Sequence, residues 1–325
     1  MYNTFMKKLF ISLFLLLSSF SFAAQPLMII HPFRETILHF PSAALPEEEL
    51  VVTVFLPEQA VPLAQKYPVV YVLDLGPKQA QEIKKLQDAY AQKALVVGIS
   101  LGKNASATEE QISEFLAREL VPYISANYST QEVSSARALV LYGPQRAELA
   151  GQLLSRKNLF GRFAFAHGGD KAVSLAGAEA SLRTLLVGRR GEVIAWQKAL
   201  EERGYPYGAG FATKLVQDPT VEQAIDLDYL FSSDEAVGVK KLAGAVYPRK
   251  IDLQAGKAYL ALAAVLNNGG VYDYLPLSVR LSPPYLDWKV LEGVLNPISG
   301  AEAGKVKLSV FVDKVKFERK IYLKK

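Results

Sequence analysis

The chain contains no cysteine, and this absence excludes several kinds of site and stabilising element. Without thiols there can be no disulfide, no thiolate metal site and no lipid anchor on a cysteine. The three histidines, His31, His39 and His167, are scattered, so none has a partner at the spacing of a metal-binding pair. We therefore expect no metal or other cofactor. Stability must come from burial, which a content of 50% hydrophobic residues can supply.

The chain also lacks a strong charge of either sign. Its formal net charge is +5 over 325 residues. The one basic cluster, Lys314 to Lys325, alternates with apolar residues as in a β-strand. Nucleic acid is therefore not an expected partner.

Long hydrophobic runs are absent except near the N-terminus. Lys7 and Lys8 precede the apolar run Leu9–Leu17, and Ser21–Ala23 fits a small-x-small cleavage site. That run is too short to span a bilayer well. Residues 1–23 are therefore predicted to be a secretory signal peptide. The mature protein is expected to be exported, periplasmic or extracellular, with no stable membrane span after signal removal.

Apolar strand patterns alternate with helical patterns over much of the chain, which predicts βαβ units and a mainly parallel sheet flanked by helices. This α/β domain is assigned to residues 24–235. The expected strands are Leu50–Leu56, Pro68–Asp74, Ala94–Ile99, Ala138–Tyr142, Arg162–Ala166, Leu182–Val187 and Ala212–Val216. The expected helices are Pro77–Ala91, a helix capped by Thr108 that runs to about Tyr128, one that starts at Gln145, Glu192–Arg203 and Val221–Phe231.

The composition changes near Gly244, after which only strand patterns and turn signals follow. This predicts a small all-β sandwich, immunoglobulin-like, over residues 240–325, with a hinge at Ser232–Ala243. Its aromatic residues could line a carbohydrate-binding face, although ordinary core and rim positions are the favoured interpretation. These residues are Tyr272, Tyr274, Tyr285 and Trp288.

The stretch Arg137–Gly151 organises the first domain. Ala138–Tyr142 is typical of a buried strand, Gly143 and Pro144 break it, and helical spacing resumes from Gln145. A strand, a sharp turn and a helix form the nucleophile elbow of α/β-hydrolases, in which G-x-S-x-G presents a serine. Here the serine position holds Gln145, whose amide cannot attack a carbonyl.

Several segments resemble the "Putative esterase" family of α/β-hydrolases, which includes esterase D, feruloyl esterases and enterochelin esterases. The segments Leu50–Pro57 (LVVTVFLP) and Lys66–Asp74 (KYPVVYVLD) look like the opening strands of the family. Phe115–Tyr128 (FLARELVPYISANY) and Leu159–Phe163 (LFGRF) resemble its later helix and strand entry. The resemblance spans about residues 50–231 and implies an α/β-hydrolase fold.

The catalytic positions that this resemblance implies are degenerate. A serine hydrolase needs a nucleophile, a base and an acid that orients the base. Gln145 takes the nucleophile position, and Asp218 aligns where the family has its histidine. An aspartate cannot replace an imidazole poised near neutral pH. Glu192 lies where the acid is expected, but it is equally plausible as a solvated residue in the first turn of a helix.

A second motif offers an alternative nucleophile. Gly98–Gly102 reads G-x-S-x-G around Ser100 and follows a strand. Residues 103–107 intervene before any helix, however, whereas an elbow leads directly into one. Ser100 is therefore a weak alternative nucleophile, and a polar loop residue is the competing interpretation.

Other polar residues are predicted at the carboxyl edge of the sheet, where α/β folds place ligands. They are Gln145, Arg146, His167, Arg189 and Arg190. If they converge, their arginine forks suit a small acidic ligand or an acidic segment of a protein partner. Solvated loop arginines and a buried turn histidine are the competing interpretations.

Three functions follow from this pattern. The favoured one is an exported, esterase-like pseudoenzyme that has lost its serine and histidine and serves in binding or scaffolding. The second is an active carboxylic-ester or carbohydrate esterase with a rearranged, serine-type site. The third is a surface-assembly protein that uses its C-terminal β-sandwich.

Overall fold

The computed structural model describes residues 35–46, 48–56, 65–90, 93–102, 107–143, 146–166, 175, 177–254 and 256–325. The predicted signal peptide (residues 1–23), His31, Gln145 and His167 lie outside these residues. No helix in the described parts contains a stretch long and apolar enough to cross a membrane.

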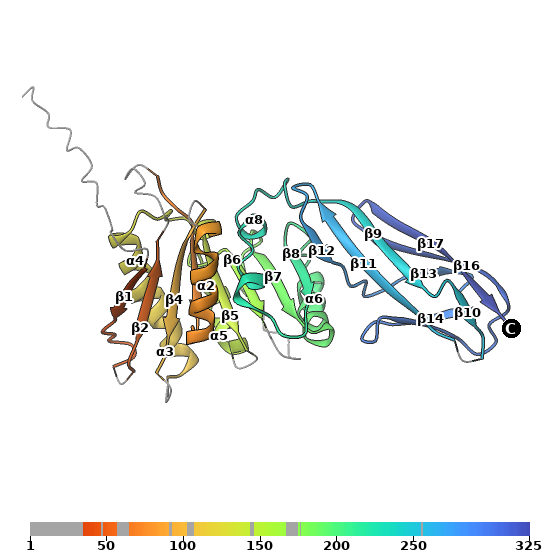
Figure 1. Cartoon of the computed structure of the whole chain (residues 1–325), viewed down its shortest axis with the longest axis horizontal. Helices are drawn as coiled ribbons and strands as arrows, with labels where there is room; N and C mark the ends of the chain where they lie inside the picture. The colour runs from red at the N-terminus through yellow and green to blue at the C-terminus, as the bar shows by residue number, and fades with distance from the viewer. Residues whose placement is uncertain are drawn as a thin grey trace, which may run out of the picture.

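The core of the fold is a mixed β-sheet whose central strands run parallel (Figure 1). Strands β3, β5, β6, β7 and β8 lie side by side in this order and pair in parallel. On the other side of β3 lies β4, also parallel to it. Beyond β4, β2 pairs antiparallel with β4, and β1 pairs antiparallel with β2. Nearly all residues of these inner strands are buried, as expected for a sheet covered on both faces. The strands are β1 (Glu35–His39), β2 (Val51–Phe55), β3 (Val69–Leu73), β4 (Leu95–Ser100), β5 (Arg137–Tyr142), β6 (Arg162–Ala166), β7 (Arg183–Gly188) and β8 (Phe211–Leu215).

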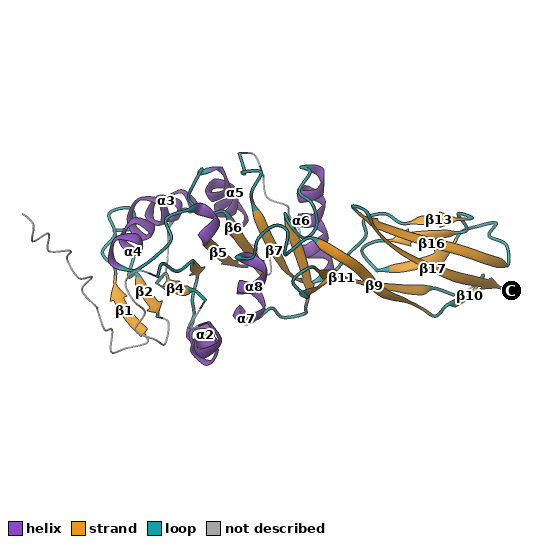
Figure 2. Cartoon of the chain, turned by 90° about the horizontal axis from the view of Figure 1, so that it is seen from above, coloured by secondary structure: helices purple, strands orange, loops and turns teal. Residues whose placement is uncertain are grey.

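Helices flank the sheet in two layers, with α3, α4, α5 and α6 on one face and α2, α7 and α8 on the other (Figure 2). Thr108 caps α3 as predicted: its Oγ1 accepts the Gln111 backbone N–H at 3.2 Å, and the Gln111 side chain accepts the Thr108 N–H at 2.9 Å. A π-helical turn, Phe115–Leu120, joins α3 to α4. The helices are α2 (Pro77–Tyr90), α3 (Glu109–Glu114), α4 (Val121–Asn127), α5 (Ala147–Ser155), α6 (Arg190–Glu202), α7 (Val221–Ala224) and α8 (Leu227–Leu230).

The predicted single helix Val221–Phe231 is wrong, because the structure has two short helices there. Ile225 leaves the helical conformation, and the Asp226 carboxylate starts α8 by accepting the Tyr229 backbone N–H at 3.0 Å. The other carboxylate oxygen of Asp226 accepts the hydroxyl of Tyr272 at 2.8 Å. This contact comes from a strand far along the chain, so it could not be read from local spacing.

The C-terminal part is entirely β, as the sequence predicts, and its strands belong to two sheets. β12 pairs with β8 through Asp273 and Thr213, so the first sheet continues into the C-terminal region. The second sheet has the order β10-β17-β16-β13. The immunoglobulin-like arrangement and the division at 235–240 stay predictions. The strands are β9 (Val239–Tyr247), β10 (Lys250–Asp252), β11 (Ala258–Leu266), β12 (Val271–Asp273), β13 (Arg280–Ser282), β14 (Leu286–Lys289), β15 (Val294–Pro297), β16 (Gly304–Val312) and β17 (Val315–Lys324).

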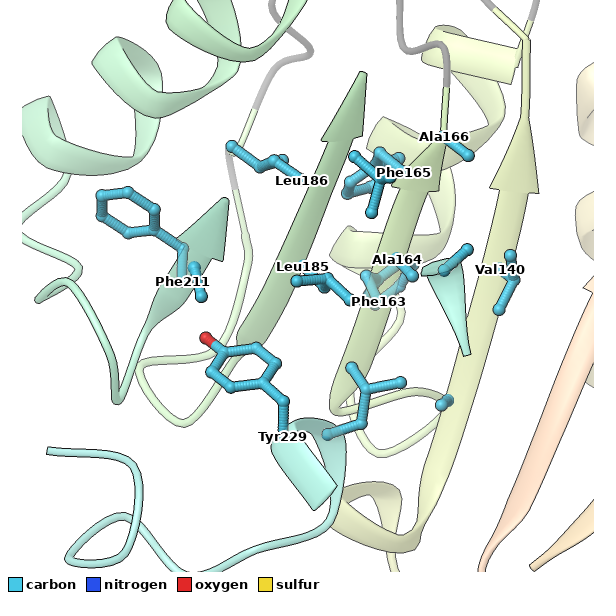
Figure 3. Packing of buried hydrophobic residues seen from close by; sticks show 14 of the residues in the cluster. Val140, Phe163, Ala164, Phe165, Ala166, Leu185, Leu186, Phe211 and Tyr229 are labelled. Carbon is cyan, nitrogen blue, oxygen red and sulfur yellow. The ribbon is translucent and has the colours of Figure 1, made fainter. Parts of the chain in front are cut away.

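Large aromatic side chains fill the space between the sheet and its helices. Figure 3 shows Phe163 and Phe165 of β6 among aliphatic residues of the neighbouring strands, with Tyr229 of α8 nearby. Trp196 of α6 stacks on Phe165 with ring centroids 4.1 Å apart. The Tyr229 hydroxyl, buried in this core, donates to the Gly208 carbonyl at 2.8 Å, which satisfies its one polar group.

Two arginines buried at the amino ends of β6 and β7 fix the segment that leads towards β9. Arg183 is fully buried; it donates to the carbonyls of Tyr229 at 2.9 Å and Ser232 at 2.6 Å and pairs with Asp234. Arg162 donates to the Leu230 carbonyl at 2.8 Å. The predicted hinge is thus held to the sheet over these residues, and β9 begins at Val239, inside that predicted hinge.

Candidate functional site

The strand, turn and helix that the sequence singled out lie at the centre of the parallel sheet. β5 pairs in parallel with β3 on one side and β6 on the other. Gly143 then adopts a φ of +89°, a left-handed conformation that glycine adopts without strain, and α5 begins at Ala147. The predicted strand and the helix that follows it are therefore confirmed. Gln145 lies between strand and helix in sequence, but outside the described residues.

Arg146, the residue that precedes α5, is bound by two carboxylates (Asp74 and Glu109). Its Nε and Nη2 donate to Oδ2 and Oδ1 of Asp74 at 2.6 and 2.8 Å, a two-pronged ion pair. Its Nη1 donates to Oε1 of Glu109 at 2.8 Å. The side chain of Arg146 is only 13% exposed, and those of Asp74 and Glu109 are 25% and 20% exposed. Three separate parts of the chain are thus joined beside the elbow.

The electrostatics of this cluster follow from its burial and its composition. Desolvation opposes the charge of Arg146, but hydrogen bonds and negative charge from Asp74 and Glu109 outweigh it and raise the pKa of the guanidinium. Burial raises the pKa of Glu109 despite its pairing with Arg146, and the charges of Asp74 and Glu148 add to that shift. Arg146 therefore stays charged, and its fork is already occupied by the protein's own carboxylates.

Arg146 is thus paired within the protein, and its predicted part in a binding site for acidic ligands stays a prediction. Sequence reasoning missed both partners of the arginine. Asp74 directly follows β3 and has a φ of +58°, which is uncommon for a residue other than glycine. An aspartate at the carboxyl end of a buried strand is the one signal that could have identified it. Glu109 is an ordinary acidic residue in the first turn of a helix, and nothing in the sequence distinguishes it.

Ser100, the alternative nucleophile, is the last residue of β4 and pairs with Val51 in the antiparallel ladder to β2. The next helix, α3, begins only at Glu109, so the described residues around Ser100 do not form a strand-to-helix turn. The first glycine of its motif has a packing role. A Cβ on Gly98 would lie 2.2 Å from Cδ2 of Leu75. Close packing against Leu75 thus explains why the first position of the G-x-S-x-G match is a glycine.

Glu192 and Asp218, at the positions expected for the acid and the histidine, both contact Arg189. Oε2 of Glu192 accepts the backbone N–H of Arg189 at 3.2 Å and so caps the start of α6. Asp218 has a side chain that is 89% exposed, and its Oδ1 lies 3.8 Å from Nη2 of Arg189. Arg189 also donates from Nε to the Gln217 carbonyl at 3.2 Å. Glu192 therefore caps a helix, and Asp218 forms an exposed surface pair with Arg189.

Arg190 contacts a different part of the chain from Arg146 and Arg189, and the predicted convergence of these residues stays a prediction. Nη1 of Arg190 donates to the Val290 carbonyl at 3.3 Å. Its guanidinium lies so close to Gly293 that a Cβ there would be 2.9 Å from Cζ. Burial lowers the pKa of Arg190, and the charge of Asp273 opposes this shift. Arg189 has the extended backbone of an N-cap residue, whereas Arg190 is the first residue of α6, and their side chains reach different surroundings.

The remaining aromatic and polar candidates have structural positions. Tyr272 and Tyr274 are buried, and Trp288 donates from Nε1 to the Pro276 carbonyl at 2.8 Å, which agrees with the core-and-rim interpretation. The Tyr142 hydroxyl donates to the Pro219 carbonyl at 2.7 Å, tying the end of β5 to the loop after β8. No group of side chains suited to holding a metal ion occurs among the described residues. His167 lies outside them.

Comparisons with known proteins agree with the resemblance to the "Putative esterase" family that the sequence motifs indicate. The family model described as "Putative esterase" matches residues 42–141. No functionally curated protein is detectably similar to this chain.

Similar solved structures include a ferulic acid esterase, with 15% identity and a TM-score of 0.44, covering 61% of this chain and 96% of that one. FphF, a fluorophosphonate-binding serine hydrolase from Staphylococcus aureus, has 11% identity and a TM-score of 0.48, covering 62% and 100%. The enterobactin esterase FES from Shigella flexneri has 16% identity and a TM-score of 0.45, covering 62% and 59%. Over residues 42–141, this chain resembles the "Putative esterase" family, as its strand and helix motifs predicted.

Proposed function

We propose that this chain is an exported, esterase-like pseudoenzyme that has lost its catalytic serine and histidine and acts as a scaffold. Gln145 replaces the nucleophile, and its amide has no proton that a base could remove to make a reactive oxygen. Asp218, at the histidine position, has a carboxylate in place of the imidazole that serves as the base of a serine hydrolase. Export rests on the predicted signal peptide at residues 1–23.

The observation that supports this proposal best is the ion-pair cluster beside the elbow. Arg146 occupies the position directly after Gln145, and all three of its nitrogen atoms donate to Asp74 or Glu109. A substrate carboxylate or a developing oxyanion would have to displace one of these partners. The cluster therefore favours a structural use of this edge of the sheet over ligand binding.

An active esterase with a rearranged site is the competing function, and it depends on Ser100. The placement of Ser100 at the end of β4, paired with Val51, does not favour it. The third function, surface assembly through the C-terminal β region, rests on the predicted β-sandwich alone.

Hydrolysis of p-nitrophenyl acetate and butyrate tests the proposal. The purified chain and the variants Ser100→Ala and Gln145→Ala should all give the same background rate, because loss of a complete triad costs a factor of about 10⁶. Turnover of several per second that disappears in Ser100→Ala alone would establish the rearranged esterase. Turnover that disappears in Gln145→Ala alone would instead show that the elbow still takes part in catalysis.

A further inference from the structure

The second sheet, β10-β17-β16-β13, turns one face to solvent, and strand register collects the basic residues on it. Lys307 lies opposite Lys320, and Tyr322 lies between Lys305 on one neighbouring strand and Lys250 on the other. Because paired residues point to the same face, these side chains form one surface. We call this surface the basic face; its exposed cations are Lys250, Arg280, Lys305, Lys307, Lys316, Lys320 and Lys324.

Few negative charges balance these seven cations. By the same register only Asp252 and Glu318 share the face. Oε1 of Glu318 is already bound to Lys307 at 2.8 Å and Lys316 at 2.5 Å. Seven cations and two carboxylates give the basic face a net charge of +5. The face therefore carries a local excess of positive charge.

Two aromatic side chains stand among the cations. Phe311 is 45% exposed and Tyr322 is 46% exposed, although both are large enough to favour burial. Arg280 and Lys316 lie over the ring of Phe311, with Cζ and Nζ 5.4 and 5.5 Å from its centroid. Tyr322 also lines a hollow of about 450 Å³ whose other lining residues include Arg249, Lys307 and Lys320. An apolar ring amid cations is suited to a boundary between water and a less polar phase.

The shape and chemistry of the basic face indicate what it would bind. Six of its seven cations are lysines, which act as point charges, whereas planar recognition of a single phosphate or carboxylate favours arginine. The charges spread across four strands instead of following one row, so a linear polymer would reach only part of them. A flat surface of many separate negative charges would meet them all. We propose that the basic face docks on the surface of a bilayer that contains anionic phospholipid, as a peripheral contact.

Sedimentation of the full chain with vesicles tests this proposal. The vesicles contain 30 mol% (roughly a third) phosphatidylglycerol in phosphatidylcholine, or phosphatidylcholine alone as the reference for any apolar adsorption by the N-terminal segment. The triple variant Lys305→Gln, Lys307→Gln, Lys320→Gln should bind anionic vesicles about 100-fold more weakly, since each lysine near such a surface contributes about fivefold. Binding of the unaltered chain should weaken as salt is raised.

A matched variant controls for net charge. Lys78→Gln, Lys85→Gln, Lys198→Gln removes three exposed lysines from α2 and α6 and should leave the affinity within about twofold. Equal loss in both triple variants, or equal affinity for the two kinds of vesicle, would overturn the proposal. Binding to heparin or duplex DNA through the same lysines, without vesicle binding, would also overturn it and assign the face to a polyanion. Should the first triple variant unfold, the single variants Lys250→Gln and Lys324→Gln replace it, and each should bind anionic vesicles about fivefold more weakly.

Discussion

Arg146 donates two hydrogen bonds to the carboxylate of Asp74, from Nε to Oδ2 at 2.6 Å and from Nη2 to Oδ1 at 2.8 Å. The two residues are 72 positions apart in the chain, at the ends of the adjacent parallel strands β5 and β3. This is the edge where α/β folds place their ligands. At this edge the ion pair joins the segments that follow β3 and β5, and Glu109 adds a second carboxylate to it.

Arg146→Met should destabilise the fold by about 2–3 kcal/mol, because it leaves Asp74 and Glu109 largely buried without their shared cation. Urea unfolding at pH 7 measures the change. Adding Asp74→Asn and Glu109→Gln to Arg146→Met should restore a large part of the loss, since no unpaired charge then remains. A loss below about 0.5 kcal/mol would show that the cluster is solvated and contributes as little as surface pairs do.

Glu109→Gln should leave stability unchanged or slightly higher at pH 7. Burial raises the folded-state pKa of Glu109 above its ordinary value, so the folded state prefers the protonated form. The stability that this group contributes is therefore present at low pH and lost as pH rises through the folded pKa. Between pH 4 and pH 7 the unaltered chain should lose stability relative to Glu109→Gln. The opposite trend would show that pairing with Arg146 dominates over desolvation.

Arg189→Ala and Arg190→Ala should differ although the residues are adjacent. The Arg189 side chain is 58% exposed, so its loss should change the free energy of unfolding by less than about 0.5 kcal/mol. Arg190 packs against Gly293 and donates to the Val290 carbonyl, so its loss should cost about 1–2 kcal/mol. Thermal unfolding of the two single variants measures this contrast. Equal effects would contradict the divergent placement of the two side chains.

The fold should unfold in base as its buried and partly buried tyrosines ionise. Burial raises the pKa of Tyr142, Tyr207, Tyr229 and Tyr272 above the ordinary value of 10.0. Each phenol thus contributes stability below pH 10 that is lost as pH rises further. Phenolate absorbance at 295 nm and far-ultraviolet ellipticity, followed from about pH 9 to 12, should therefore change together for this group. Full ionisation of all tyrosines near pH 10 with the ellipticity intact would contradict their burial.

The elements with strong local signals were predicted well from the sequence. β11 is an unbroken apolar run that ends at Leu266, directly before the turn residues Asn267–Gly270. The capping box at Thr108 and the glycine turn after β5 were also read correctly, since each depends on residues within a few positions.

The contacts that decide the site are long-range and were not predictable in this way. The pairing of Asp273 with Thr213, which carries the sheet into the C-terminal region, involves a three-residue strand with no distinctive pattern. That continuation places Val290 and Gly293 where they meet Arg190. Likewise, Glu109 meets Arg146 only through tertiary packing of α3 beside α5. The partners of the arginines could not be predicted, because charge and loop position do not specify the direction of a side chain.

The central claim is that this esterase-like chain has no activated serine, and labelling with a fluorophosphonate probe tests it most directly. Such a probe phosphonylates a serine only where a neighbouring base makes the hydroxyl nucleophilic. We expect the native chain to show no more labelling than the heat-denatured chain at every serine, Ser100 included, by peptide mass spectrometry. Stoichiometric labelling of a single serine in the native chain, abolished by its substitution with alanine, would contradict the account.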